Sequence, residues 1–524
     1  MTPPEPDLTD WFLTREGRRN PDTRLDTRHP EGRAWSEGNR VRPLIDGAAY
    51  FAELHERLEA TGEGDLVLVV CWEGDGDQRL TDDPDSEVAE VLCRAVGRGV
   101  DVRGLFWHSR VAAVGGAEGD NLSLGERLQE RGAEVLLDLR VRSAGSHHQK
   151  FVVIRHRDDP SRDVAYVGGI DLCHSRRDDA EHAGDPQVFE IADEYGETPG
   201  WHDVQAAVTG PAVFDVETVF RERWEDPTPL TRSPLGWLDR IRGVDLQPSP
   251  LPPQADPPPS PEGGRHLVQL LRTYPRLGVT RHYAFARQGE RSVALGITRA
   301  VERAEHLVHV EDQYLWSPRV GRLFAAALRD RPDLRVVAVV PRFTDLTGML
   351  GRTPQQLGRH RALAPMLEAA PERVGVYGIE NAAGLPVYVH AKVCLVDDAW
   401  ASIGSANLNR RSWTHDSELT VAAVDPDGTL VADLRRRLAA EHLGCDPDEV
   451  PDGPAELFAA YADAAGRLDA WHAAGRQGPR PPGQLRRLSL PPLGPVTRTL
   501  ASVPYRFLHD RDGRGWRMRL RNRF

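Results

Sequence analysis

Hydrophobic and polar positions in the first half of the chain predict helices that alternate with buried strands. Apolar residues at helical spacing in Tyr50–Ala60 lead into an apolar run at Leu66–Trp72, and Ser86–Gly97 leads into Val102–Trp107. A third helix is predicted near Leu124–Arg131. Helical periods between short apolar runs are typical of an α/β fold. We therefore expect a mixed, largely parallel sheet with helices packed against it.

The second half repeats this plan. Helices are predicted at Ala294–Ala304, at Gly321–Arg329 and near His360–Glu368, with strands at Leu307–Glu311 and Leu334–Val340. The match predicts two pseudo-symmetric α/β halves in one chain. The expected segments are a first half at 1–246, a Pro-rich extended linker at 247–264, a second half at 265–445, and a C-terminal helical segment with a basic tail at 446–524.

Lysine is almost absent from the chain. Of 66 Lys and Arg residues, Lys150 and Lys392 are the two lysines, which leaves 64 Arg. Each lysine follows a histidine by two positions, in His148-Gln149-Lys150 and in His390-Ala391-Lys392. Lys carries a compact ammonium on a flexible stem, whereas Arg presents a planar fork. The pattern indicates that both positions require the ammonium.

Matched strands follow the two His-x-Lys motifs. The first motif precedes strands predicted at Phe151–Ile154 and Ala165–Val167, and the second precedes Val393–Val396 and Ala401–Ile403. The second strand of each pair ends in a small, polar sequence, Gly168-Gly169-Ile170-Asp171 or Gly404-Ser405-Ala406-Asn407. The repeated order indicates that both motifs serve one function.

Two histidines and two lysines suffice to cleave a phosphodiester, which is anionic and resists attack. One neutral His attacks phosphorus and forms a phosphohistidine, and the other, initially protonated, donates a proton to the leaving oxygen. The lysines stabilise the non-bridging oxygens, where negative charge builds. The sequence shows no cluster of metal ligands that the chemistry demands, so we expect neither a metal nor another cofactor.

Acidic residues are expected to support the two histidines. A last predicted strand begins with Asp203 in the first half and with Glu418 in the second. We expect Asp203 to orient His148, and Glu418 to orient His390. The alternative is that these acids are solvated residues at strand edges.

The small and polar residues after the second strands are expected to face the same site. Asp171 and Asn407 occupy matched positions, as do Gly169 and Ser405. Glycine at 168, 169 and 404 would let the backbone approach a phosphate without an intervening Cβ. His147 and His174 are interpreted as bystanders.

Composition restricts the class of protein. A net charge of −13 argues against a nucleic-acid-binding protein, which usually shows a basic footprint. No stretch approaches the ~18 uninterrupted apolar residues of a membrane span, and the N-terminal residues show no signal-peptide core. The five cysteines are far apart, which favours reduced thiols. We expect a cytoplasmic protein that can lie at a membrane surface.

The segment Arg476–Phe524 is basic, with twelve Arg against Asp510 and Asp512. Aromatic residues are interleaved with the arginines, among them Tyr505 and Phe507. Two interpretations remain open. The segment contacts anionic lipid headgroups, or it packs back on the acidic body of the protein.

The motifs resemble those of the phospholipase D superfamily, whose signature is H-x-K-x4-D followed by G-[GS]-x-[ND]. The second copy matches in full, with Asp397 as the motif Asp, whereas Arg155 stands at that position in the first copy. Val167–Leu172, Trp201-His202-Asp203 and Glu311-Asp312-Gln313-Tyr314 resemble the lipid-cleaving, eukaryote-like branch. The resemblance covers roughly 11–442. It implies one active site at the interface of the two halves, with His148 as nucleophile and His390 as general acid.

The resemblance also implies a substrate class. We expect a phospholipase D that hydrolyses the headgroup phosphodiester of a glycerophospholipid at a membrane surface to phosphatidic acid, with water or an alcohol as acceptor. His148, Lys150, His390, Lys392 and Asp397 are the candidate catalytic residues. Alternatives are a phosphatidyltransferase of the cardiolipin synthase kind, a nuclease-type phosphodiesterase, and a non-catalytic phosphate-binding protein suggested by Arg155. No nucleic-acid partner is expected, and the sequence leaves the oligomeric state open.

Overall fold

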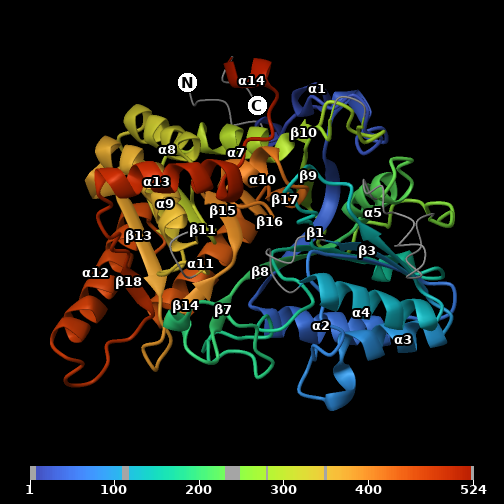
Figure 1. Cartoon of the computed structure of the whole chain (residues 1–524), viewed down its shortest axis with the longest axis horizontal. Helices are drawn as coiled ribbons and strands as arrows, with labels where there is room; N and C mark the ends of the chain where they lie inside the picture. Colours follow the sequence, from blue (N-terminus) through green and yellow to red (C-terminus); the bar gives the residue numbers. More distant parts are fainter. Residues whose placement is uncertain (1–7, 109–116, 231–247, 279–280, 347–350, 521–524) are drawn as a thin grey trace.

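A single mixed sheet runs through both halves of the chain. The computed structural model describes residues 8–108, 117–230, 248–278, 281–346 and 351–520. In this part of the chain, 16 strands join in the order β18-β13-β12-β11-β15-β16-β17-β9-β1-β8-β6-β5-β2-β3-β4, with β10 paired to β9. The order reads as two equivalent series that meet where β9 pairs with β1 (Figure 1). The predicted pseudo-symmetric α/β halves are confirmed.

Equivalent strands carry equivalent parts of the sequence. The first series comprises β1 (Ser36–Ile45), β8 (Val204–Thr209), β6 (Val164–Gly168), β5 (Phe151–Arg155), β2 (Leu66–Cys71), β3 (Asp101–Trp107) and β4 (Glu134–Asp138). The second comprises β9 (His266–Tyr274), β17 (Glu418–Val424), β16 (Trp400–Gly404), β15 (Lys392–Val396), β11 (Leu307–Asp312), β12 (Arg335–Val339) and β13 (Val374–Ile379). Further strands are β7 (Gly200–His202), β10 (Glu290–Arg291), β14 (Val387–Val389) and β18 (Leu485–Arg487).

The sheet is mixed, as predicted, but it is not largely parallel. Parallel pairing is confined to β2-β3-β4 and to β11-β12-β13. The strands that follow the His-x-Lys motifs are antiparallel to both neighbours, since β5 pairs with β2 and β6, and β15 pairs with β11 and β16. Each motif therefore lies at the same edge of the sheet as the carboxyl ends of the parallel strands.

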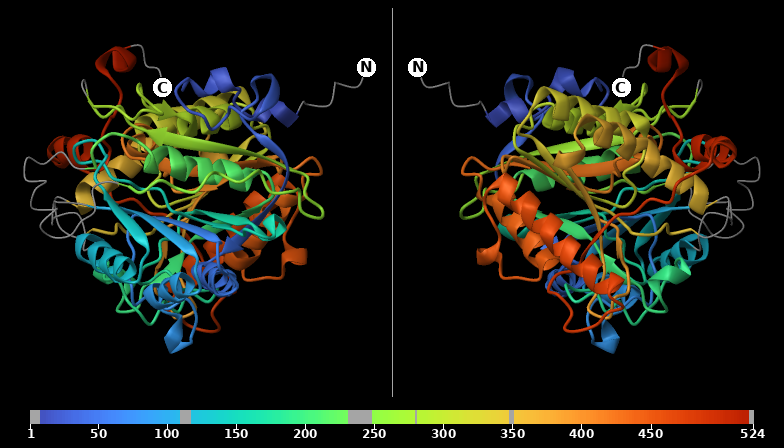
Figure 2. Two further views of the ribbon diagram at one scale, coloured as in Figure 1. Left: turned by 90° about the vertical axis from the view of Figure 1, so that its right-hand side faces the viewer. Right: turned by 90° about the vertical axis from the view of Figure 1, so that its left-hand side faces the viewer.

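Helices cover the outer faces of the two half-sheets (Figure 2). The apolar faces of α2 (Gly47–Glu59), α3 (Val88–Gly97) and α4 (Ala117–Glu130) form one core with the first half. Those of α7 (Ser292–Val301), α8 (Pro318–Asp330) and α9 (Arg352–Ala369) form another with the second half. A third core, shared by both halves, contains α5 (Ala212–Trp224) and α11 (Thr429–Leu443). These shared contacts hold the half-sheets at a fixed angle.

Helix α9 begins eight residues earlier than the apolar pattern predicts. Its first turns bury Gln355 and Arg359, and Arg359 donates a hydrogen bond to the Pro341 carbonyl at 2.7 Å. Polar residues that are buried through hydrogen bonds leave no apolar period in the sequence. The pattern could therefore detect only the second part of this helix.

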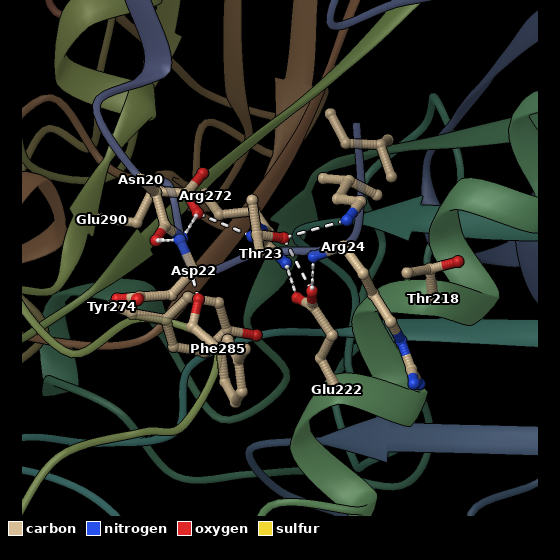
Figure 3. A network of polar contacts seen from close by, with 12 residues as sticks. Asn20, Asp22, Thr23, Arg24, Thr218, Glu222, Arg272, Tyr274, Phe285 and Glu290 are labelled. Carbon is tan, nitrogen blue, oxygen red and sulfur yellow. Dashed lines mark hydrogen bonds and ion pairs between the residues drawn. The ribbon is translucent and has the colours of Figure 1, made fainter. Parts of the chain in front are cut away.

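A buried ionic network joins the N-terminal segment, the first half and the second half (Figure 3). Arg272 on β9 binds Glu222 of α5 and Glu290 of β10, each at 2.6 Å. Arg18, in α1 (Arg15–Arg18), binds Glu290 at 2.9 Å. Removing one partner of such a network leaves a buried charge uncompensated, at a cost of about 3–5 kcal/mol. The network therefore fixes the seam between the halves.

The remaining chain is extended between the halves and helical after them. Residues 248–264 form no helix or strand, and Gln247, the first residue of the predicted linker, lies outside the described residues. The C-terminal part contains α12 (Pro454–Ala473), β18, α13 (Pro495–Pro504), a π-helical turn (Tyr505–His509) and α14 (Trp516–Leu520), and α10 (Arg410–Thr414) lies before β17. None of the helices in the described ranges has the length and apolar character needed to span a bilayer.

Candidate active site

The structure brings the two His-x-Lys motifs together at the seam between the halves. His148 and Lys150 lie just before β5, which begins at Phe151. His390 lies just before the counterpart β15, whose first residue is Lys392. Both lysines act electrostatically on both histidines, and Lys150 also acts on Lys392. All four side chains are buried or nearly so, and His148 is the most accessible, with 16% of its side chain exposed. The four groups thus form one cationic site.

The acids cross between the halves, which corrects the pairing expected from the sequence. The Nδ1 atom of His148 lies 2.9 Å from Oε2 of Glu418, and Nδ1 of His390 lies 2.6 Å from Oδ2 of Asp203. Each histidine is therefore oriented by the acid of the other half. Position in the sequence could not reveal this, because the crossing depends on how the half-sheets face one another.

Backbone hydrogen bonds cross the seam in the same way. The His148 amide donates to the Ser417 carbonyl at 2.9 Å, and the His390 amide donates to the His202 carbonyl at 2.7 Å. Ser417 and His202 directly precede Glu418 and Asp203. The parallel pairing of β7 with β14 extends this contact. Backbone and side chain of each motif are thus both held by the opposite half.

The two acids are packed against the small residues that follow the second strands. A Cβ on Gly169 would lie 2.3 Å from Oδ1 of Asp203, so the carboxylate occupies the space that a side chain would fill. In the second half, Ser405 Oγ donates to Oε2 of Glu418 at 2.6 Å. Gly168 and Gly404 likewise permit close approach of the neighbouring strand. At these positions the glycines make room for neighbouring protein groups.

The environments of the two lysines differ. Lys150 Nζ lies 3.1 Å from Oδ2 of Asp171, whose Oδ1 accepts the Trp72 amide at 2.9 Å. The equivalent of Asp171 is Asn407, which donates to Gln313 Oε1 at 3.4 Å. Burial lowers the pKa of Lys392 to about 7, partly offset by Asp203. The second lysine thus carries its charge less readily until an anion binds.

Burial is the main influence on the pKa values of the histidines. Burial and the ammonium groups of Lys150 and Lys392 lower the pKa of His148 well below its ordinary value. Burial, Lys392 and Arg176 lower the pKa of His390 in the same direction. A bound phosphodiester would counter the lysine charges and so favour the imidazolium form.

Burial acts in the opposite direction on the two acids. Burial and Asp416 raise the pKa of Glu418 to about 8, and burial raises the pKa of Asp203. Burial thus favours the uncharged form of both members of the His148–Glu418 pair, and it acts in the same direction on His390 and Asp203.

Asp397 does not belong to this site, contrary to its inclusion among the candidate catalytic residues. It follows the last residue of β15, and a five-residue strand spans roughly 17 Å. Its carboxylate accepts three backbone amides of the turn that begins β11, those of Glu305, His306 and Leu307, at 2.6–2.9 Å. Its role is to fix this turn.

Arg155, at the position equivalent to Asp397, is equally remote from the motifs. Its guanidinium pairs with Asp163 at 2.7 Å and with Glu217 at 2.5 Å, and it donates to the Asp256 carbonyl at 2.7 Å. The departure from the motif therefore changes the packing at the far end of β5 and leaves the site intact.

Aromatic rings border both histidines; the sequence placed Trp201 in a motif of the resemblance and Trp72 at a strand end, but it predicted neither contact. Trp72 contacts the His148 ring edge-on with centroids 6.1 Å apart, and Lys150 Nζ lies 5.5 Å from its centroid. The Trp201 and His390 rings have centroids 5.1 Å apart, and the guanidinium carbon of Arg176 lies 3.8 Å from the Trp201 centroid. For Trp72, the feature of the sequence that points to the site is its position at the end of a strand equivalent to β11. His147 and His174 bind Gln149 and Asp77, as expected of bystanders.

Two groups of side chains have the donor types of a metal site. They are Asp46, His182, His202 and Glu441, and His202, Glu311 and His442. His202 belongs to both, and its nitrogens lie 2.7 Å from Glu311 and 3.0 Å from Asp46. Against the effect of burial, these carboxylates raise the pKa of His202 well above its ordinary value. The ion pairs of this cluster hold His202, and with it the strand that precedes Asp203.

Comparison with known proteins agrees with this geometry. The family profile "Phospholipase D" matches residues 64–318, and the profile "Cardiolipin synthase, PLD-like domain" matches residues 304–441. The chain belongs to the phospholipase D superfamily.

Several curated relatives are similar along much of the chain. Phospholipase D beta 1 of Arabidopsis thaliana is 24% identical over 75% of this chain and 44% of its own length. Phospholipase D alpha 2 of Oryza sativa subsp. japonica is 26% identical, over 78% and 60%. The chain thus spans about half the length of these relatives. A solved phosphatidylserine synthase of Haemophilus influenzae Rd KW20 shares the fold, with a TM-score of 0.51 and 14% identity over 83% of this chain and 93% of that one.

The role of Asp397 can be tested by Asp397→Asn. Asn keeps one acceptor oxygen and tolerates the left-handed backbone at this position, where φ is 50°. We expect the loss of charged acceptors to lower the free energy of unfolding by about 1–3 kcal/mol, with turnover per folded molecule unchanged. Chemical unfolding and an activity assay measure the two effects. Lost turnover at unchanged stability would show that Asp397 takes part in the chemistry.

The electrostatics of the histidines can be tested by NMR titration of ¹³C-labelled imidazoles. In the free protein, both His148 and His390 should titrate below their ordinary range. Lys150→Met should raise the pKa of His148, because a positive charge beside the imidazolium is removed. Arg176→Met is the matched control and should raise the pKa of His390 without a comparable change at His148. Unchanged titration in Lys150→Met would contradict the shared site.

Proposed function

We propose that the protein is a phospholipase D that hydrolyses the headgroup phosphodiester of glycerophospholipids to phosphatidic acid. The observation that carries this proposal is the reciprocal pairing of two His-x-Lys motifs with two acids in one buried cationic site. Such a site supplies a nucleophile, a proton donor and two fixed charges. The similarity to curated phospholipases D supports a lipid substrate.

The proposed first step is attack by His148. When the His148–Glu418 pair has lost one proton, Nδ1–H is donated to the carboxylate and the Nε2 lone pair is available. Nε2 bonds to phosphorus while the bond from phosphorus to the headgroup oxygen breaks. His390, protonated and held by Asp203, transfers its proton to that oxygen. The assignment of His148 rather than His390 as nucleophile rests on the family resemblance.

Hydrolysis of the phosphohistidine completes the cycle. Neutral His390 takes a proton from water, whose oxygen attacks phosphorus and displaces His148, which yields phosphatidic acid. Lys150 and Lys392 bind the non-bridging oxygens in both steps. The compact ammonium of Lys150 fits beside Trp72 and Asp171, where a guanidinium fork would need more room.

A phosphatidyltransferase is the second candidate function. The second half of the chain matches the profile "Cardiolipin synthase, PLD-like domain". The same phosphohistidine would then react with an alcohol in place of water, so the two functions differ only in the acceptor. A nuclease is disfavoured by the net charge of −13, since binding to nucleic acid depends on cationic contacts.

A vesicle assay on phosphatidylcholine, with and without ethanol, tests the proposal. Wild type should release choline and form phosphatidic acid, with phosphatidylethanol appearing when ethanol is present. His148→Ala should lower the rate by about 10³-fold or more, and Lys150→Arg should also be strongly impaired because the fork replaces a compact charge.

Arg155→Lys is the matched control for these variants, since Arg155 is equally buried but remote from the motifs. Its turnover per folded molecule should stay within about twofold of wild type. Transfer to glycerol or phosphatidylglycerol that exceeds hydrolysis in water would favour the phosphatidyltransferase. If the folded protein cleaves no glycerophospholipid, whatever its headgroup, the proposed lipid substrate is refuted.

A further inference from the structure

The C-terminal helix α13 has apolar side chains on two opposite faces. Ala501 and Tyr505 point inward and pack with Leu357 of α9. The outward apolar face, as we define it, consists of residues at helical spacing and the next residue of the chain, Val496, Leu500, Val503, Phe507 and Leu508. Their exposed fractions are 56–72%. A helix that is packed on one side is usually polar on the other.

The concentration of these side chains is unusual within the described residues. Nine large apolar residues are strongly exposed in that part of the chain, and five of them form the outward apolar face. Single exposed apolar residues are normal on a protein surface, whereas a contiguous group marks a binding surface. The face therefore requires a partner with an apolar interior.

The surrounding charge is positive. The sequence from Arg476 to His509 contains six Arg and no acidic residue. Arg498 and Arg506, on α13 and the following turn, are exposed and form no ion pair in the described part of the chain. The acids that follow are already engaged, Asp510 with Tyr505 and Asp512 with Arg514. An apolar face bordered by unpaired arginines is typical of a helix that lies in the surface of an anionic bilayer.

The face lies close to the candidate active site. The Leu508 carbonyl accepts a hydrogen bond from Arg411 at 2.9 Å, and Arg411 also donates to the Ala144 carbonyl at 3.1 Å. Ala144 is four residues before His148. Helix α13 itself packs on α9, on the outside of the second half (Figure 1). Contact of this face with a membrane would bring His148, the most exposed of the four motif side chains, toward the lipid.

We propose that the outward apolar face docks the protein on anionic phospholipid membranes. The five apolar side chains insert between acyl chains, and Arg498 and Arg506 bind headgroup phosphates. Two copies of the chain placed face to face would instead bring their arginines together, which disfavours a dimer through this surface. The proposal rests on the proposed function for its purpose, delivery of a lipid substrate, but its test does not depend on catalysis.

Cosedimentation with vesicles tests the docking. The full chain should bind vesicles of phosphatidylcholine mixed with phosphatidylglycerol and bind pure phosphatidylcholine more weakly. The double variant Leu500→Glu and Phe507→Glu should lower vesicle affinity by about tenfold or more. Replacing both Arg498 and Arg506 by Ala should lower affinity for mixed vesicles by about fivefold for each arginine and weaken its salt dependence.

The matched control is Leu385→Glu. Leu385 is 42% exposed in the turn between β13 and β14, so the variant adds the same charge at an exposed leucine outside α13. It should leave vesicle affinity within about twofold of wild type. Circular dichroism and thermal melting confirm that each variant is folded. Unchanged vesicle affinity of the folded double variant would overturn the proposal.

Two further measurements separate the explanations. Cleavage of a short-chain phosphatidylcholine below its critical micelle concentration should be unchanged in the double variant, because the site itself is intact. If wild type cleaves no lipid, the proposed function fails, while vesicle binding still decides the docking. Sedimentation velocity that shows a wild-type dimer, converted to monomer by the double variant, would assign the face to a second copy and overturn the proposal.

Discussion

The hydrogen bonds that cross the seam between the halves are the constraint on which the site depends. His148 binds Glu418 through its ring and Ser417 through its backbone, and His390 binds Asp203 and His202 in the same way. Neither half could orient its own histidine. The site therefore exists only when both halves are folded and docked, which explains why the seam is also held by the buried network around Arg272.

Burial gives these contacts their strength and their cost. Carboxylates, ammonium groups and imidazoles lie together with little access to water, where an unpaired charge is strongly unfavourable. Burial favours the uncharged forms of both histidines and both acids. Gly169 and Ser405 complete the arrangement, the first by leaving space for Asp203 and the second by donating to Glu418. An anionic phosphodiester is the ligand that this balance of charge favours.

The sequence predicted the repeat and the strands around the two His-x-Lys motifs, because each depends on local order along the chain. The two lysines were decisive, since Arg replaces Lys everywhere else. The crossing of Asp203 and Glu418 could not be predicted, because it depends on the docking of two half-sheets. Asp397 was wrongly assigned to the site because it belongs to the family motif, and recurrence in a motif does not show which residues lie together in space. The contacts of Trp72 with His148 and of His202 with its acids could not be predicted, since buried polar contacts leave no period in the sequence.

The C-terminal segment shows the same limit. Its basic composition left two interpretations open, and in the structure the parts of the segment differ from one another. Arg486 packs back on Asp469 and Glu380, as the packed interpretation expects, whereas α13 exposes an apolar face farther along. Composition alone could not separate these two parts, because both are rich in arginine.

The most direct test of the account is to remove each acid and follow both histidines by NMR titration. Glu418→Gln removes the acid at Nδ1 of His148 and should shift the pKa of that imidazole, with a much smaller effect at His390. Asp203→Asn should do the reverse. That result would establish that each half orients the histidine of the other. A response of His390 to Glu418→Gln and of His148 to Asp203→Asn would contradict the crossed site and the mechanism built on it.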